Sequence, residues 1–179
     1  MITPVSSISR PLTRMGAISA LAALGLAACS TTAPSVDGGV SSGAPLPNAG
    51  YDWYLNSDDT EISLSYGLAE TDDVPMDLSC EAGSKRLTLL LNVEKGHPLR
   101  IDLESGGETE TYHATGEAAP LSNGVDLTAT APSTDPVFLR FRQLGWLAVS
   151  SGSSRRPLVA TPATLPLVER FFQICEQTG

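Results

Sequence analysis

The chain has 179 residues, of which 41% are hydrophobic and 17% are charged, and its formal net charge is −9. This length suits one globular domain with non-globular ends and is too short for two ordinary domains. The low charged content disfavours a charge-rich cytosolic enzyme, and the acidic balance argues against a nucleic-acid partner, because such binding depends on the neutralisation of phosphates.

The first 28 residues have the pattern of an export signal. Arg10 and Arg14 lie in an N-terminal stretch without acidic residues, and residues 15–28 (MGAISALAALGLAA) form an apolar run that ends in small side chains. The run is shorter than the roughly 20 apolar residues that a transmembrane helix needs. We therefore expect residues 1–28 to be a cleaved signal peptide rather than a permanent membrane span.

The end of this run, Leu26-Ala27-Ala28-Cys29, resembles the lipobox of bacterial lipoproteins. The resemblance implies cleavage before Cys29 and a lipid on its thiol, so that acyl chains anchor the mature protein in a membrane. By analogy with lipoprotein sorting, Ser30 in the next position indicates the outer membrane, with the protein facing the periplasm. The alternative is a cysteine that follows an ordinary signal peptide by chance.

Residues 29–50 are expected to be the lipidated cysteine and a flexible tether. The segment after Cys29 has Leu46 as its single large apolar residue and is dominated by Ser, Thr, Gly, Pro and Ala. Such a segment buries too little surface to offset the entropy of ordering, and a flexible chain of this length spans about 25 Å. The globular domain is predicted over residues 51–179, which is long enough for a core without a metal.

Alternation of apolar and polar residues predicts a mainly antiparallel sheet, arranged as a meander. The expected strands cover residues 62–68, 76–80, 87–93, 99–103, 109–115 and 125–129. Leu90 adds an apolar side chain to the second face of the third of these strands, which favours a central position in the sheet. Gly106-Gly107 is expected to form the hairpin turn before residue 109.

Two short helices complete the predicted α+β fold. The first covers residues 137–144, with Phe138 and Phe141 on its buried face and Gly145 as its stop. A strand over residues 146–149 and a polar turn over residues 150–156 are expected next. The last helix is predicted to begin near Thr164, with its apolar stripe toward the core. That stripe consists of Val168, Phe171, Phe172 and Cys175.

The chain has three cysteines, and the lipobox accounts for Cys29. Because exported proteins enter an oxidising compartment, a disulfide between Cys80 and Cys175 is the default expectation. It would tie the C-terminal helix to the sheet. The alternative is two separately buried thiols. Neither a redox CxxC nor a CxxC zinc pair occurs in the sequence.

The sequence carries no catalytic or metal-binding signature, and no cofactor or metal is expected. His97 lies beside Pro98 in a predicted turn and His113 lies in a polar strand, without a ligand spacing. The acidic groups at residues 58–61 and 70–73 do not match a calcium loop and are interpreted as solvated loops. No nucleophile elbow or phosphate loop is present.

Two sets of side chains are candidates for binding. Arg155 and Arg156 could hold a carboxylate or phosphate, with a flexible, soluble loop as the alternative. Trp53 and Tyr54 would mark a binding surface if they were exposed, with a first strand docked into the core as the alternative. Two further arginines, Arg140 and Arg142, are expected to face solvent.

Residues 135–149 and 168–175 resemble the closing part of small uncharacterised exported proteins of Gram-negative bacteria. The resemblance implies a shared fold and a C-terminal helix closed by a cysteine, but no known activity.

Two functional hypotheses follow. The first is a non-catalytic accessory or binding module for an envelope protein partner, of which an inhibitor of an envelope hydrolase is one version. The alternative is an envelope hydrolase with Ser153 as nucleophile and His113 or His97 as base, because such sites are recognised by geometry rather than by chain order.

Overall fold

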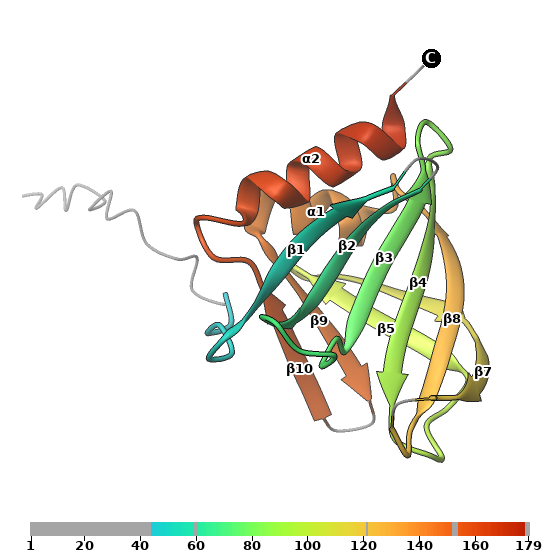
Figure 1. Cartoon of the computed structure of the whole chain (residues 1–179). Helices are drawn as coiled ribbons and strands as arrows, with labels where there is room; N and C mark the ends of the chain where they lie inside the picture. The colour runs from blue at the N-terminus through green and yellow to red at the C-terminus, as the bar shows by residue number, and fades with distance from the viewer. Residues whose placement is uncertain (1–43, 59–60, 121, 152–153, 178–179) are drawn as a thin grey trace, which may run out of the picture. The chain divides into compact units, whose positions relative to one another are not determined.

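The computed structural model describes residues 44–58, 61–120, 122–151 and 154–177. Figure 1 shows its strands and helices. The prediction of a mainly antiparallel sheet with two helices is confirmed. In chain order they are β1 Tyr51–Ser57, β2 Glu61–Leu68, β3 Met76–Glu81, β4 Arg86–Val93, β5 Arg100–Ser105, β6 Glu108–His113, β7 Thr115–Ala118, β8 Val125–Pro132, α1 Pro136–Leu144, β9 Trp146–Ser151, β10 Ser154–Val159 and α2 Leu165–Glu176.

The strands form two sheets. The first has six strands in the order β1-β2-β3-β4-β8-β7, and the second has four in the order β10-β9-β5-β6. The expected single meander is therefore wrong, since β8 pairs with β4 and β9 pairs with β5. The strand expected over residues 109–115 is divided: β6 belongs to the second sheet and β7 to the first, because the chain crosses between them at Ala114.

Strand β4 occupies the interior of the first sheet, between β3 and β8, as its apolar pattern predicts. Leu87, Leu89 and Leu91 are buried in the core, because alternate side chains of a strand point to the same face. Leu90 points to the other face and remains 41% exposed. The first sheet therefore carries a large apolar side chain on the face turned away from the core.

The two helices line the core with aromatic side chains. Helix α1 has Pro136 at its start and ends at Gly145, whose φ of 74° lies in the left-handed region that favours glycine. It packs on β5, β6 and β9, whereas α2 packs on β1 and β2. All four residues of the predicted α2 stripe are buried: Val168, Phe171, Phe172 and Cys175. Within the described residues, neither helix combines the length and the apolar character that a membrane crossing requires.

A disulfide joins Cys80 on β3 to Cys175 on α2, with 5.9 Å between their Cα atoms, which confirms the predicted pair. The turn after β3 also holds the end of α2, because the backbone N–H of Gly83 donates to Ile174 O at 3.0 Å. A Cβ at Gly83 would lie 2.6 Å from Gln177 O, so this approach requires glycine. Covalent and backbone contacts together fix the C-terminal helix to the sheet.

Arg142 joins the two helices, and the expectation that it faces solvent is wrong. Its guanidinium bonds Glu169 at 3.0 Å and Glu176 at 3.0 Å, both on α2, and lies 5.2 Å from the centre of the Phe172 ring. Ser133 completes the network by donating to Glu176 at 3.0 Å. The spacing of apolar residues in α1 indicates that Arg142 lies off the apolar stripe of this helix. It does not indicate that α2 packs on the side where Arg142 lies.

The fold begins before Tyr51, within the segment assigned from the sequence to the tether. Ala44 packs against an apolar cluster of the second sheet, formed by Trp146, Ala148 and Val159. The side chain of Asn48 donates to Pro157 O at 2.9 Å, and Tyr51 N donates to Asn48 O at 3.2 Å. These contacts hold Ala44 and Asn48 against the domain, whereas Leu46 between them is 85% exposed.

Asp52 on β1 organises the chain that leads into α2. Its carboxylate accepts hydrogen bonds from the Thr161 hydroxyl at 2.7 Å, the Thr161 N–H at 3.1 Å and the Thr164 hydroxyl. Burial opposes ionisation, but these hydrogen bonds outweigh it and hold the pKa of Asp52 below its usual value. The charged form is therefore the one that the fold favours.

We expect Asp52→Asn to lower the free energy of unfolding by about 1–2 kcal/mol at pH 7, because an amide accepts fewer and weaker hydrogen bonds than a carboxylate. A lowered folded pKa gives stability that is present above the unfolded pKa of about 3.9 and is lost as the pH falls through the folded value. Urea midpoints at pH 7 and pH 3 should therefore differ less in the variant. The exposed Glu81→Gln is the control, and an equal loss in both variants would contradict the assignment.

Candidate functional site: a groove at one end of the larger sheet

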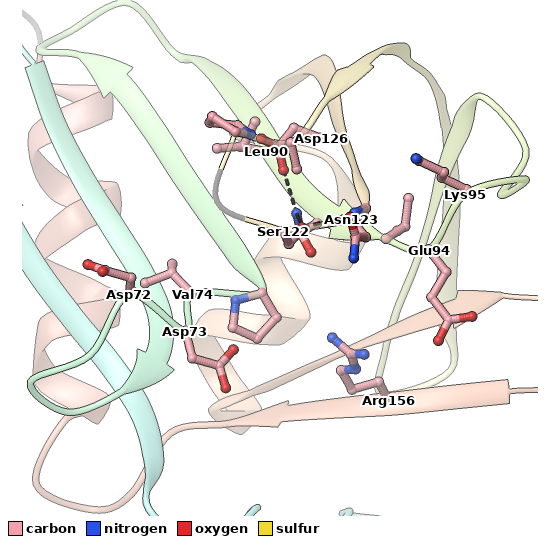
Figure 2. Close-up of a pocket in the computed structure, with 16 residues that line it drawn as sticks. Asp72, Asp73, Val74, Leu90, Glu94, Lys95, Ser122, Asn123, Asp126 and Arg156 are labelled. Atoms are coloured by element: carbon pink, nitrogen blue, oxygen red, sulfur yellow. Dashed lines mark hydrogen bonds between the residues drawn. The ribbon is translucent and has the colours of Figure 1, made fainter.

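A groove of about 820 Å³ lies where the β2–β3, β4–β5 and β7–β8 connections meet strand β10 (Figure 2). Its wall on the larger sheet comes from the ends of β4 and β8, and its opposite wall from β10 of the smaller sheet. A volume of this size is typical of sites for small molecules or short peptide segments. The groove is therefore the candidate site.

The groove has an apolar floor. Val74 and Leu90 line it and are 40% and 41% exposed, and the buried Pro75 and half-buried Val93 also contribute to the lining. The backbone fixes this floor, since Asn92 N donates to Pro75 O at 3.0 Å and so joins the β2–β3 connection to β4. Large apolar side chains left open to solvent inside a concavity are typical of surfaces that a partner covers.

Four carboxylates line the groove, and two of them are already hydrogen-bonded. Asp73 accepts a hydrogen bond from the hydroxyl of Tyr51, and this bond raises the pKa of Tyr51. Asp126 accepts one from the side-chain amide of Asn92 at 2.6 Å, drawn as a dashed line in Figure 2. The other two are Asp72 and Glu94. Among the described residues, neither Asp72 nor Glu94 has an ion-pair partner.

Arg156 extends from β10 into the space between Asp73 and Glu94 (Figure 2). It is exposed, and no described carboxylate lies within ion-pairing distance of it. The polar turn expected over residues 150–156 is wrong here, because Ser154 already begins β10 and Arg156 pairs with Val149 of β9. Strand pairing therefore fixes the backbone that carries this guanidinium.

The neighbouring Arg155 points to the other face of β10, as alternation requires. Its guanidinium pairs with Glu104 at 2.6 Å and lies 5.2 Å from the centre of the Trp146 ring. Of the two arginines proposed from the sequence, only Arg156 therefore lines the groove.

The other candidates from the sequence lie elsewhere. Trp53 is fully buried, with its ring centre 5.2 Å from Tyr66 and 5.0 Å from Phe141, so it belongs to the core and offers no surface. Tyr54 is half-buried on β1 and does not line the groove. Cys29 and Ser153 lie outside the described residues.

The two histidines are not brought together with any of these groups. His97 Nδ1 lies 2.9 Å from Pro98 O, and its Nε2 has no hydrogen-bond partner in the described part of the chain. His113 is exposed on the edge strand β6. Within residues 44–58, 61–120, 122–151 and 154–177, no three His, Cys, Asp or Glu side chains are placed to hold a metal ion.

Sequence reasoning missed the groove because its walls come from four segments that are distant along the chain. One local signal was present. Leu90 is an apolar residue on the otherwise polar face of β4, and its side chain forms part of the floor.

Comparison with known proteins adds no relative: no protein-family model, curated protein or solved structure matches the chain.

Proposed function

We propose that the protein is an outer-membrane lipoprotein, anchored through Cys29 and facing the periplasm, that acts as a non-catalytic accessory module. The module binds an envelope protein partner in the groove beside Arg156. The observation that carries this proposal is the groove itself. Arg156, which has no ion-pair partner among the described residues, lines it together with the exposed apolar side chains of Val74 and Leu90.

Burial of Val74 and Leu90 by a partner would supply the non-directional part of the binding energy, at about 25 cal/mol for each Å² of apolar surface removed from water. The charged rim would supply orientation and selectivity. The anchor and the tether would deliver this face to partners within reach of the membrane. Such a module needs a shaped surface rather than a nucleophile.

Site-specific photo-crosslinking in intact Gram-negative cells tests this function. A photoreactive residue replaces Asn123, an exposed side chain that lines the groove, in the full-length protein. The matched control carries it at Thr109, an exposed position on β6 outside the groove. We expect a discrete covalent adduct from position 123 and none from position 109. Equal labelling at the two positions, or no adduct at either, would overturn the proposal.

The anchor is tested separately by mass spectrometry of the N-terminal peptide of the purified protein. We expect a mature chain that begins at Cys29 with acyl chains attached. Cys29→Ala should leave the protein unprocessed or release it from the membrane fraction. An unmodified Cys29, or retention of residues 1–28, would remove the lipid anchor from the proposal.

A further inference from the structure

We propose that the groove binds a short peptide segment that carries both a free carboxylate and a free ammonium group. This assignment deepens the proposed function and rests on it, since it states which chemistry the partner places in the groove. It follows from the signs of the charged groups around the apolar floor, from which of these groups already have partners, and from where they lie.

The carboxylate of the ligand pairs with Arg156. A guanidinium stays charged at all physiological pH values and presents a planar fork that matches the two oxygens of a carboxylate. Strand pairing with β9 fixes the backbone of Arg156, and the side chain reaches into the groove without a described ion-pair partner. An arriving carboxylate therefore displaces no described ion pair.

The ammonium group of the ligand lies against the acidic rim. Asp73 and Asp126 are already hydrogen-bonded, to Tyr51 and Asn92, whereas Asp72 and Glu94 remain without ion-pair partners in the described chain. Asp72 and Glu94 lie in separate connections, β2–β3 and β4–β5, on either side of the floor. With Asp73 and Asp126 they give the lining a net negative charge, which attracts a cation to the groove.

The balance of charge selects a ligand of both signs. Acidic side chains outnumber basic ones along the lining, where Lys95 is the second cation, so a purely anionic ligand such as a phosphate meets net repulsion. A purely cationic ligand leaves Arg156 uncompensated. A ligand with one carboxylate and one ammonium satisfies both, because each of its charges then has a group of opposite sign in the lining.

The floor and the size favour a peptide with small side chains. Val74 and Leu90 offer apolar contact, and the side-chain amide of Asn123 at the rim can bond a peptide group. A volume of about 820 Å³ accommodates a few residues in extended form.

The test is isothermal titration of the detergent-solubilised, full-length mature protein with four probes at low salt. The first probe, tetraalanine, has both charged termini. The second is its C-terminal amide, which lacks the carboxylate, and the third is its N-acetyl form, which lacks the ammonium. The fourth is blocked at both ends and lacks both charges. We expect tetraalanine to bind at least 10-fold more tightly than either singly blocked form. Equal affinity for all four probes, or no binding of tetraalanine, would overturn the assignment.

Two adjacent arginines supply the matched variants. Arg156→Gln is expected to weaken tetraalanine binding at least 10-fold and to leave the affinity for the C-terminal amide unchanged, because the lost contact is the one to the carboxylate. Arg155→Gln, on the opposite face of β10, should change neither affinity. A loss of the same size for all probes in Arg156→Gln, or the same loss in Arg155→Gln, would contradict the pairing.

The two proposals fail separately. An adduct at position 123 in cells combined with no dependence on the peptide termini keeps the module and overturns the ligand assignment. Terminus-dependent peptide binding combined with no adduct in cells keeps the ligand assignment and overturns the envelope protein partner.

Discussion

Replacement of Cys80 and Cys175 together by alanine is expected to lower the free energy of unfolding by about 2–5 kcal/mol. The bond closes a loop with a sequence separation of 95 residues, and loops of this length give about 4–5 kcal/mol in the chain-entropy model. Both side chains are buried, at 4% and 0% exposure. Both cysteines are replaced because a single replacement would leave the other as an unpaired, reactive thiol.

Urea unfolding with and without dithiothreitol measures this effect. Reductant should shift the midpoint of the wild-type protein toward that of the double variant and leave the variant unchanged. The contacts of Gly83 and Lys85 with the end of α2 remain in the variant, so native-like circular dichroism is expected below the transition. An unchanged midpoint would show that these backbone contacts, rather than the disulfide, hold α2.

The second large effect is expected from Arg142→Met, which should cost about 2–3 kcal/mol. Methionine keeps an unbranched side chain of similar length but removes the guanidinium from Glu169, Glu176 and the Phe172 ring. Loss of hydrogen bonds between charged, partly buried groups accounts for the size. Glu169 is the more exposed of the two glutamates, so solvent screens its attraction to Arg142. The expected cost is therefore below that of breaking a fully buried ion pair.

Arg140→Met is the matched control, since Arg140 lies on the same helix, is exposed and bonds only Gln143 among the described residues. We expect a change within about 0.5 kcal/mol. The bonds from Arg142 hold the pKa of Glu169 below its usual value, so their stability is present above the unfolded pKa of about 4.3 and is lost as the pH falls through the folded value. The cost of Arg142→Met should therefore shrink in acid; a cost independent of pH would contradict the ionic account.

The elements whose pattern is local were predictable from the sequence. The alternation of Ile62, Leu64 and Tyr66 predicts β2, and the stripe ending at Cys175 predicts the buried face of α2. The disulfide was predicted from the expectation of export and from the two cysteines that remained once the lipobox was assigned to Cys29. In each case the deciding information lies within one segment or in the composition.

The pairing of the strands was not predictable in the same way. A period of two assigns faces to a strand but does not say which strand lies beside it. The pairing of β5 with β9 joins residues such as Leu103 and Val149 across two intervening strands of the other sheet, β7 and β8. The same lack of distant information hid the partners of Arg142 and the walls of the groove.

Strand β10 was missed for a further reason. Ser154, Arg155 and Arg156 are polar because they lie near the end of an exposed edge strand, whereas Leu158 and Val159 carry the buried part of its pattern. A polar segment beside glycine and serine resembles a turn in sequence, although pairing with β9 makes it a strand.

The measurement that tests the central claim most directly is the yield of the covalent adduct from position 123 in cells that express Arg156→Gln or Arg155→Gln. If the groove beside Arg156 is the binding face, Arg156→Gln should reduce the adduct at least 10-fold at equal protein level, and Arg155→Gln should leave it unchanged. An adduct that persists at full yield in Arg156→Gln would contradict the account, because the partner would then be held by another face of the domain.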